Sequence, residues 1–235
     1  MTKRLTKIGV NPDFQELSSF VHELPTVFET GGKVIYKGRN ELKEFDVEGK
    51  KLIVKSYQLP HLLNRIIYNF FRASKAKRSY SYALMLRKLG IGSPAPVGYY
   101  STGSWLLFGR SYFVCLKSDC PYTYRDFEKT VFPNQEQILR AIARTTAMLH
   151  ENGLLHKDYS AGNILFRTID EKVEVEIIDL NRMRFGNVDI EAGCKNFERL
   201  PGTHGMFAIL AEEYAKARGF DVQTCLKLIE KNKGI

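Results

Sequence analysis

The chain has 235 residues, 44% of them hydrophobic, and a formal net charge of +9. This apolar content can fill one large core or two smaller ones, which excludes an intrinsically disordered chain. The sequence has neither an apolar run near the roughly 18 residues that span a bilayer nor the apolar stretch of a signal peptide. We therefore expect a cytoplasmic protein.

Four cysteines are scattered along the chain, without the close spacing of a zinc site or the density of a disulfide scaffold. They are Cys115, Cys120, Cys194 and Cys225. We expect reduced thiols, most of them buried.

Positive charge is concentrated in the first half of the chain. Residues 1–118 contain 19 lysines and arginines against 8 acids, whereas residues 119–235 contain 16 against 18. No acid occurs between Glu48 and Asp119. Such a basic surface attracts nucleic acid, anionic lipid headgroups or a phosphorylated glycolipid, or it serves only to keep the protein soluble.

The first half of the sequence predicts an antiparallel sheet. Between residues 26 and 57, apolar runs separated by glycine-containing turns are typical of a strand meander, with strands at 34–36, 45–47 and 51–55. Two helical patterns follow, at 62–72 and 74–89, and then two strands near 105–108 and 112–116.

The second half predicts mainly helices. A long helix begins at Asn134, where Gln137 completes the pattern of a capping box, and ends at Gly153. A hairpin of residues 163–166 and 173–180 and two helices near 205–218 and 221–232 follow. A β-rich part joined to an α-rich part indicates an α+β protein with two lobes and a cleft between them.

The strongest chemical signal is the segment from His156 to Asn163, followed by a short hairpin and Asp179. Asn163 lies five residues after Asp158, and Asp179 lies 21 residues after it. Taken singly, these residues are typical of turns and caps. As a set they suit phosphoryl transfer, in which one carboxylate faces a nucleophilic hydroxyl while an amide oxygen and a second carboxylate hold Mg²⁺ against the phosphates.

This order and spacing resembles the protein-kinase-like superfamily, whose catalytic loop reads His-x-Asp-x-x-x-x-Asn. The resemblance implies that Asp158 is the catalytic base and that Asn163 and Asp179 are the metal ligands. His156 would be structural, and Lys55, at the end of an apolar strand, would bind the phosphates of ATP. The implied cofactors are ATP and Mg²⁺, with Mn²⁺ as the alternative metal.

The resemblance also implies one kinase-like domain over residues 1–235. Its β-rich N-lobe would span residues 1–116, with a hinge near 112–118, and its mainly helical C-lobe would span residues 119–235. Adenine would lie against the hinge strand at the ATP-binding residues Phe113, Val114 and Cys115.

Three departures from the superfamily pattern qualify these expectations. Asp179 is followed by Leu180-Asn181, and no Ala-Pro-Glu segment occurs downstream, so regulation by an activation loop is not expected. No helix glutamate is present to pair with Lys55, and Ser81 stands near its place. Gly38-Arg39-Asn40 replaces a multi-glycine loop, so Arg39 becomes a candidate for binding the phosphates.

A narrower resemblance rests on six short motifs in a fixed order. They are Gly38-Arg39-Asn40, Ile53-Val54-Lys55, the segment 74–78, the segment 90–96, the catalytic loop and Asp179-Leu180-Asn181-Arg182. Together they resemble the lipopolysaccharide core kinase family, which includes kinases that act on Kdo and heptose. The family implies transfer of the ATP γ-phosphate to a sugar hydroxyl of an inner-core glycolipid, at the cytoplasmic face of the inner membrane.

The partner implied by this family is an anionic glycolipid, either Kdo–lipid A or core oligosaccharide, reached through peripheral association with the membrane. The basic first half of the chain suits such an acceptor. The candidates for contacting the acceptor or the membrane are Arg65, Arg72, Lys75, Lys77, Arg78 and Lys157. For each of them a solvated surface position is the alternative. Tyr68, Phe70 and Phe71 fit either a headgroup layer or core packing.

Other functions remain as alternatives. The same fold occurs in Ser/Thr protein kinases that resemble the RIO group and in phosphotransferases of the aminoglycoside or choline type. A pseudokinase scaffold is disfavoured because Asp158, Asn163 and Asp179 are all present. Nucleic-acid binding is not expected, because the sequence has no recognition helix or aromatic stacking platform. The sugar, its hydroxyl and the oligomeric state are left open by the sequence.

Overall fold

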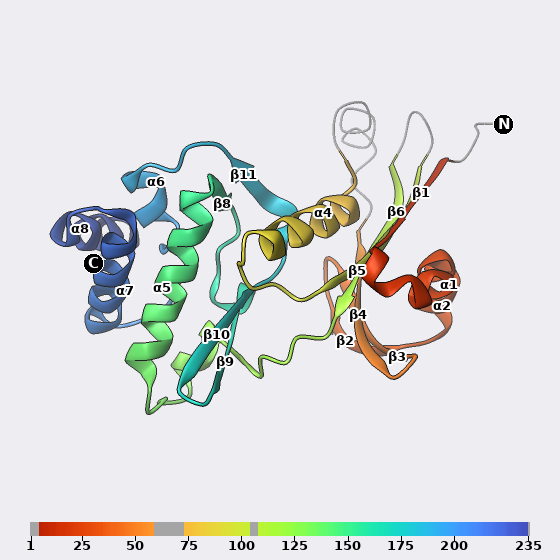
Figure 1. Ribbon diagram of the computed structural model, residues 1–235, viewed down its shortest axis with the longest axis horizontal. Coiled ribbons are helices and arrows are strands. Elements are labelled where there is room, and N and C mark those ends of the chain that lie inside the picture. Colours follow the sequence, from red (N-terminus) through yellow and green to blue (C-terminus); the bar gives the residue numbers. More distant parts are fainter. Residues whose placement is uncertain (1–4, 59–72, 104–107, 235) are drawn as a thin grey trace. The chain divides into compact units, whose positions relative to one another are not determined.

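The computed structural model describes residues 5–58, 73–103 and 108–234. The chain divides into two compact units. Unit 1 comprises residues 1–87 and 94–117, and unit 2 comprises residues 88–93 and 118–235. Each unit has its own sheet and helices (Figure 1).

Unit 1 is built on a six-stranded antiparallel sheet of order β1-β5-β6-β4-β3-β2. The strands are β1 (Leu5–Val10), β2 (Lys33–Lys37), β3 (Glu41–Val47), β4 (Lys50–Tyr57), β5 (Pro96–Gly103) and β6 (Phe108–Leu116). Glu48 and Gly49 both have positive φ, at 51° and 70°, which is the geometry of a tight hairpin turn. The predicted meander over β2, β3 and β4 is therefore confirmed.

One face of this sheet is covered by helices α1 (Ser18–His22) and α2 (Leu24–Thr30). Their buried side chains pack with Leu52 and Val54 of β4. The prediction that the meander begins at residue 26 was wrong, because α2 has Pro25 in its first turn and buries Leu24 and Phe28, four residues apart on one helix face.

The other face of the sheet packs against α4 (Lys75–Lys88) through a cluster of Tyr57, Ala76 and Tyr99. Side chains alternate along β4, so Lys55 and Tyr57 share this face while Val54 points into the opposite core. The helix predicted at 74–89 is confirmed. The strand predicted near 112–116 is confirmed as part of β6, Phe108–Leu116. Its neighbour β5 was not predicted. The strand predicted near 105–108 and the helix predicted at 62–72 fall on residues outside the described part, apart from Phe108.

Unit 2 is mainly helical. Its helices are α5 (Gln135–Glu151), α6 (Ile190–Lys195), α7 (His204–Arg218) and α8 (Val222–Lys233). Its short strands are β7 (Tyr122–Thr123), β8 (Leu154–His156), β9 (Ile164–Ile169), β10 (Lys172–Ile177) and β11 (Met183–Phe185). They form one sheet of order β10-β9-β7 and a separate β11-β8 pair.

The long helix α5 starts where the sequence predicts, but without the predicted capping box. Asn134 occupies the N-cap position and makes no capping bond there. Its side-chain Nδ2 instead donates to Thr168 Oγ1 at 3.1 Å, which links the start of α5 to β9. The apolar face of α5 is buried, and Leu139 and Ile142 lie in the core of the unit.

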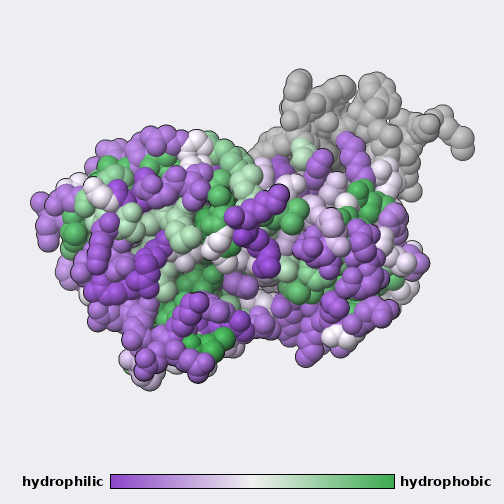
Figure 2. Space-filling view, in the orientation of Figure 1, coloured by the Kyte–Doolittle hydropathy of each residue, from purple (hydrophilic) through white to green (hydrophobic). Residues whose placement is uncertain are grey.

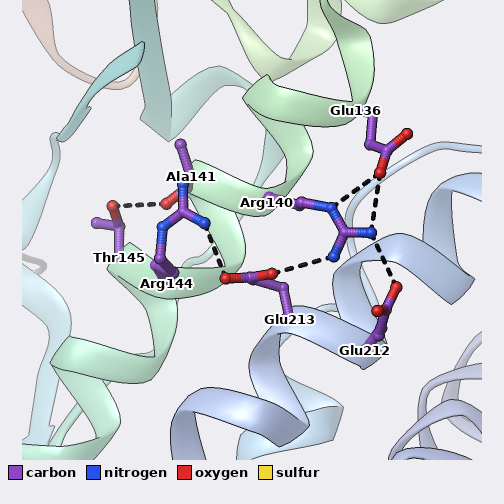
Figure 3. Close-up of polar contacts among 7 residues, drawn as sticks. All are labelled: Glu136, Arg140, Ala141, Arg144, Thr145, Glu212 and Glu213. Atoms are coloured by element: carbon purple, nitrogen blue, oxygen red, sulfur yellow. Dashed lines mark hydrogen bonds and ion pairs between the residues drawn. The ribbon is translucent and has the colours of Figure 1, made fainter. Parts of the chain in front are cut away.

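Ion pairs join α5 to α7 at the surface of unit 2 (Figure 3). Arg140 contacts Glu136, Glu212 and Glu213, and Arg144 contacts Glu213 at 2.8 Å.

Hydrophilic side chains dominate the face seen in Figure 2, with smaller apolar areas between them. Among the described residues, no helix has the length and apolar content needed to cross a membrane.

A buried histidine makes the stability of unit 2 depend on pH. His150 Nδ1 lies 2.8 Å from Tyr214 Oη, and its Nε2 lies 3.0 Å from Asn196 Oδ1. Burial lowers the pKa of His150 to about 4, although the hydrogen bond to Asn196 opposes this shift. The unfolded chain therefore binds a proton more readily than the folded protein does.

We predict that His150 contributes a stability that is complete above its ordinary pKa of 6.5 and is lost as the pH falls toward 4. The free energy of unfolding of the wild type should fall by about 1.6 kcal/mol more than that of His150→Gln between pH 6.5 and 5, measured by urea denaturation. His22→Gln, at an exposed side chain of α1 in unit 1, is the matched control. Equal slopes for His150→Gln and the wild type would contradict the prediction.

Candidate active site

The predicted catalytic loop is held by the buried imidazole of His156, at the end of β8. Its Nε2 donates to the Ile178 carbonyl at 3.1 Å, and its Nδ1 accepts from the Asp158 backbone amide at 3.1 Å. Burial lowers the pKa of His156, so the ring is neutral and both nitrogens have defined roles. One side chain thus joins the loop to the segment that leads into Asp179.

Asn163 and Asp179 are tied to the same arrangement. Asn163 Nδ2 donates to the Asp158 carbonyl at 2.8 Å, and the Ile178 amide donates to the Asn163 carbonyl at 3.0 Å. Asp179 has left-handed backbone angles of φ 58° and ψ 44°, a conformation that costs roughly 1–2 kcal/mol for a residue with a side chain. Its Oδ1 accepts from Asn181 Nδ2. The structure therefore brings the three predicted residues onto adjoining segments.

The donor atoms of Asn163 and Asp179 fit a hard divalent cation. Because Asn163 uses its amide nitrogen within the loop, its oxygen is the atom available to a metal ion. Asp179 supplies a carboxylate, and Mg²⁺ is commonly bound by one or two such oxygens together with phosphates and water. The described residues contain no group of three or more His, Cys, Asp or Glu side chains suited to a metal. Phosphate and water oxygens commonly complete the coordination of Mg²⁺ held by so few protein ligands.

Two arginines flank the carboxylate of Asp158. Arg199 Nη1 contacts Oδ1, and Arg182 Nη1 lies 3.8 Å from Oδ2. From the sequence alone, neither arginine has a predicted role in the site. Arg182 lies within the motif Asp179-Leu180-Asn181-Arg182, but Arg199 lies 41 residues beyond Asp158 and carries no local signal. Lys157 is exposed beside them, and its amide donates to the Arg182 carbonyl at 2.9 Å.

Asn196, directly after α6, links the loop to the core of unit 2. Its Nδ2 donates to the His156 carbonyl at 2.9 Å, and its Oδ1 accepts from His150 Nε2. Since His150 also contacts Tyr214 of α7, a continuous chain of hydrogen bonds runs from that helix to the loop. The sequence offered no motif for this residue.

In unit 1, Lys55 lies on the face of the sheet that α4 covers. Its Nζ is 5.4 Å from the centre of the Tyr57 ring, and Lys75 Nζ is 6.0 Å from the same ring. Tyr57 Oη forms a buried 2.7 Å hydrogen bond with Ser79 Oγ of α4. The sequence placed Ser81 near the position of a helix glutamate, whereas Ser79 makes the link between α4 and β4.

The predicted adenine-binding residues lie inside the sheet. Strand β6 is paired on one side with β4 and on the other with β5, so the backbone of Phe113, Val114 and Cys115 runs between two ladders. The side chain of Val114 is buried in the core under α1 and α2. The side chain of Phe113 packs against the cluster under α4, and the backbone of these three residues is not placed as an open hinge.

The remaining candidates have different surroundings. Arg39 is exposed in the bend between β2 and β3, where the Gly38 amide donates to the Asn40 carbonyl. On α4, Lys77 is exposed, while Lys75 and Arg78 are half-buried. Five predicted residues, Arg65, Tyr68, Phe70, Phe71 and Arg72, lie outside the described residues.

We predict that Asn196→Ala loosens the predicted catalytic loop, because it removes two partly buried hydrogen bonds. The free energy of unfolding should fall by about 2 kcal/mol, and the Asp158 amide should exchange its hydrogen faster. Urea denaturation and hydrogen exchange read by mass spectrometry measure the two effects. Asn152→Ala removes one exposed bond, from Asn152 Nδ2 to the Met148 carbonyl, and should change neither quantity appreciably. If the Asp158 amide hydrogen exchanged at the wild-type rate in Asn196→Ala, the inference that Asn196 supports the loop would be contradicted.

The segment that holds these residues is similar in sequence to a known protein family. The model of the lipopolysaccharide kinase (Kdo/WaaP) family matches residues 118–203, which include the catalytic loop, Asp179 and both flanking arginines. No curated protein sequence matches significantly.

Among solved structures, WaaP in complex with acyl carrier protein is similar with a TM-score of 0.66 and 16% identity, covering 97% of this chain and 98% of that one. A crystal structure of WbdD is similar with a TM-score of 0.52 and 13% identity, covering 86% of this chain and 46% of that one. These likenesses confirm the predicted α+β, protein-kinase-like fold. The chain's resemblance to the lipopolysaccharide core kinase family, inferred from its motifs, is confirmed by the family match over residues 118–203.

Proposed function

We propose that this protein transfers the γ-phosphate of ATP to a hydroxyl of a lipopolysaccharide inner-core sugar, either Kdo or heptose. The observation that carries the proposal is the network that holds Asp158, Asn163 and Asp179 on adjoining segments. His156 bonds the Asp158 amide and the carbonyl of Ile178, next to Asp179, and the Asn163 side chain bonds the Asp158 carbonyl. The kinase family match over the same residues supports it. The reaction would take place at the cytoplasmic face of the inner membrane, where the basic first half of the chain favours anionic lipid.

In this mechanism Asp158 accepts the proton of the sugar hydroxyl. As the hydroxyl oxygen forms a bond to the γ-phosphorus, the bond from that phosphorus to the β–γ bridging oxygen breaks, and ADP leaves with the electron pair. Asn163 and Asp179 would hold Mg²⁺, with Mn²⁺ as the alternative, and the bound metal would neutralise charge on the phosphates. Most of the rate would come from positioning and charge neutralisation.

Three cations have supporting roles in the proposal. Lys55 would orient the α- and β-phosphates. The Tyr57 ring, held by its hydrogen bond to Ser79, would position the Lys55 ammonium in place of a helix glutamate. Arg39 would contact phosphate from the bend between β2 and β3, and Lys157 would offset charge beside the base.

We assign residues 1–116 as the N-lobe and 119–235 as the C-lobe of one kinase-like domain. The hinge near 112–118 would then contribute side chains from β6 and backbone groups from its end. Activation-segment control is not part of the proposal, since the chain has neither a Phe-Gly pair after Asp179 nor an Ala-Pro-Glu segment.

We predict that Asp158→Asn lowers phosphate transfer to Kdo–lipid A by at least roughly 100-fold, because an amide cannot accept the proton. Radiolabelled ATP measures transfer, and calorimetric titration with MgATP should show nearly unchanged nucleotide binding. Asp170→Asn is the matched control, because Asp170 is exposed in the β9–β10 turn with a positive φ that asparagine tolerates. Transfer by Asp158→Asn at the wild-type rate would refute the assignment of the base.

The same assay separates the alternative functions. Protein, aminoglycoside and choline acceptors are offered beside Kdo–lipid A and a core glycolipid that carries heptose. Label that enters protein and never glycolipid would favour a RIO-like protein kinase, and label in an aminoglycoside or choline would favour a small-molecule phosphotransferase. MgATP binding without transfer to any acceptor would favour a pseudokinase.

A further inference from the structure

We propose that Arg182 and Arg199 form a subsite for an anionic group of the acceptor, a carboxylate or a phosphate monoester, next to the hydroxyl that is phosphorylated. The inference rests on the proposed function, since it assigns how the same site selects its acceptor. It differs from the acceptor contacts expected from the sequence, most of which lie in the basic first half of the chain.

The backbone around both arginines is fixed, while their side chains reach solvent. Arg182 ends the short helical turn that follows Asp179, and its carbonyl accepts from the Lys157 amide at 2.9 Å. Arg199 lies between the buried residues Phe197 and Leu200, whose backbones are hydrogen-bonded to each other. The side chains of Arg182 and Arg199 are 58% and 51% exposed, so their guanidinium groups are accessible to a ligand.

These guanidinium groups have too few acids to balance their charge. Among the described residues, Asp158 is the one carboxylate that either of them contacts. By contrast, Arg140 is surrounded by three glutamates and is only 26% exposed (Figure 3). The exposed Lys157 adds a further positive charge beside Asp158. A guanidinium has five donors and binds oxyanions in a bidentate manner, so an excess of such groups beside the base suits a carboxylate or phosphate.

The contact of Arg199 with Asp158 gives the subsite a consequence for specificity. Arg199 Nη1 occupies Oδ1, one of the two oxygens that can accept the proton of the hydroxyl. An acceptor that brings its own anion can bind the guanidinium and draw it from Oδ1 as the hydroxyl arrives. A neutral sugar has no group to do so, and the site would therefore discriminate in favour of anionic acceptors.

Steady-state kinetics with three forms of one acceptor tests the subsite. The acceptors are Kdo–lipid A, the same glycolipid with its Kdo carboxylates methyl-esterified, and the same glycolipid after enzymatic removal of its phosphates. The enzymes are the wild type, Arg182→Gln, Arg199→Gln and Arg144→Gln. The last is a matched control, since Arg144 is 52% exposed and, in the part of the chain that the structure describes, contacts one acid, Glu213, on the α5–α7 surface.

We expect kcat/KM for the intact glycolipid to fall roughly 10- to 100-fold in Arg199→Gln and in Arg182→Gln, through a higher acceptor KM. Losing one hydrogen bond to a charged group has an effect of this size. The KM for ATP should stay at the wild-type value in both variants, and Arg144→Gln should keep the wild-type kcat/KM for the intact glycolipid. Removing the recognised anion from the acceptor should lower the wild-type kcat/KM by a similar factor. It should lower the kcat/KM of Arg199→Gln little further, because that variant has already lost the same contact. The modified acceptor that shows this pattern identifies carboxylate or phosphate, and Arg199→Lys should restore part of the loss.

Each contrary result has a distinct meaning. An unchanged acceptor KM in both arginine variants, or additive losses with both modified acceptors, would overturn the subsite while leaving the kinase proposal intact. A raised KM for ATP with an unchanged acceptor KM would place the arginines at the nucleotide and also overturn it. Failure of the wild type to phosphorylate any form of this glycolipid, or a core glycolipid that also carries heptose, would instead contradict the proposed function. Melting temperatures of the variants, compared with that of Arg144→Gln, show whether each has folded.

Discussion

The candidate active site depends on one constraint, the need of a buried imidazole to satisfy both of its nitrogens. His156 is fully buried, and burial lowers its pKa, so it must donate from one nitrogen and accept at the other. The Ile178 carbonyl and the Asp158 amide meet this need. Because these two groups lie on separate segments, satisfying the ring also sets the position of the proposed base relative to the strand that leads into Asp179.

The surrounding structure reinforces this arrangement at several points. Asn196 extends the hydrogen bonds of the loop to His150 in the core of unit 2. Asp179 is held in a left-handed conformation, the kind of local strain that persists where neighbouring contacts over-determine the backbone. The site therefore combines a rigid inner support with an exposed pair of arginines, which is what acceptor selection by charge requires.

Part of this account could be predicted from the sequence, because it rests on local patterns. The spacing of Asp158, Asn163 and Asp179, the meander after residue 33 and the long helix before the loop all follow from motif or periodicity. Contacts between distant segments could not be predicted in the same way. The roles of Arg199, Asn196 and Ser79 depend on contacts with residues that are distant in sequence and become neighbours only in the folded chain. Tertiary packing also explains two local errors: the helix α2 where strand was predicted, and the Asn134 side chain, which bonds Thr168 and does not cap α5.

The most direct test of the central claim is the mass of the lipopolysaccharide core from three strains: cells with the wild-type gene, cells without it, and cells that carry Asp158→Asn. If the protein is a core-sugar kinase that uses this carboxylate, the core from the second and third strains should lack one phosphate present in the first. Identical core masses in all three strains would contradict the account.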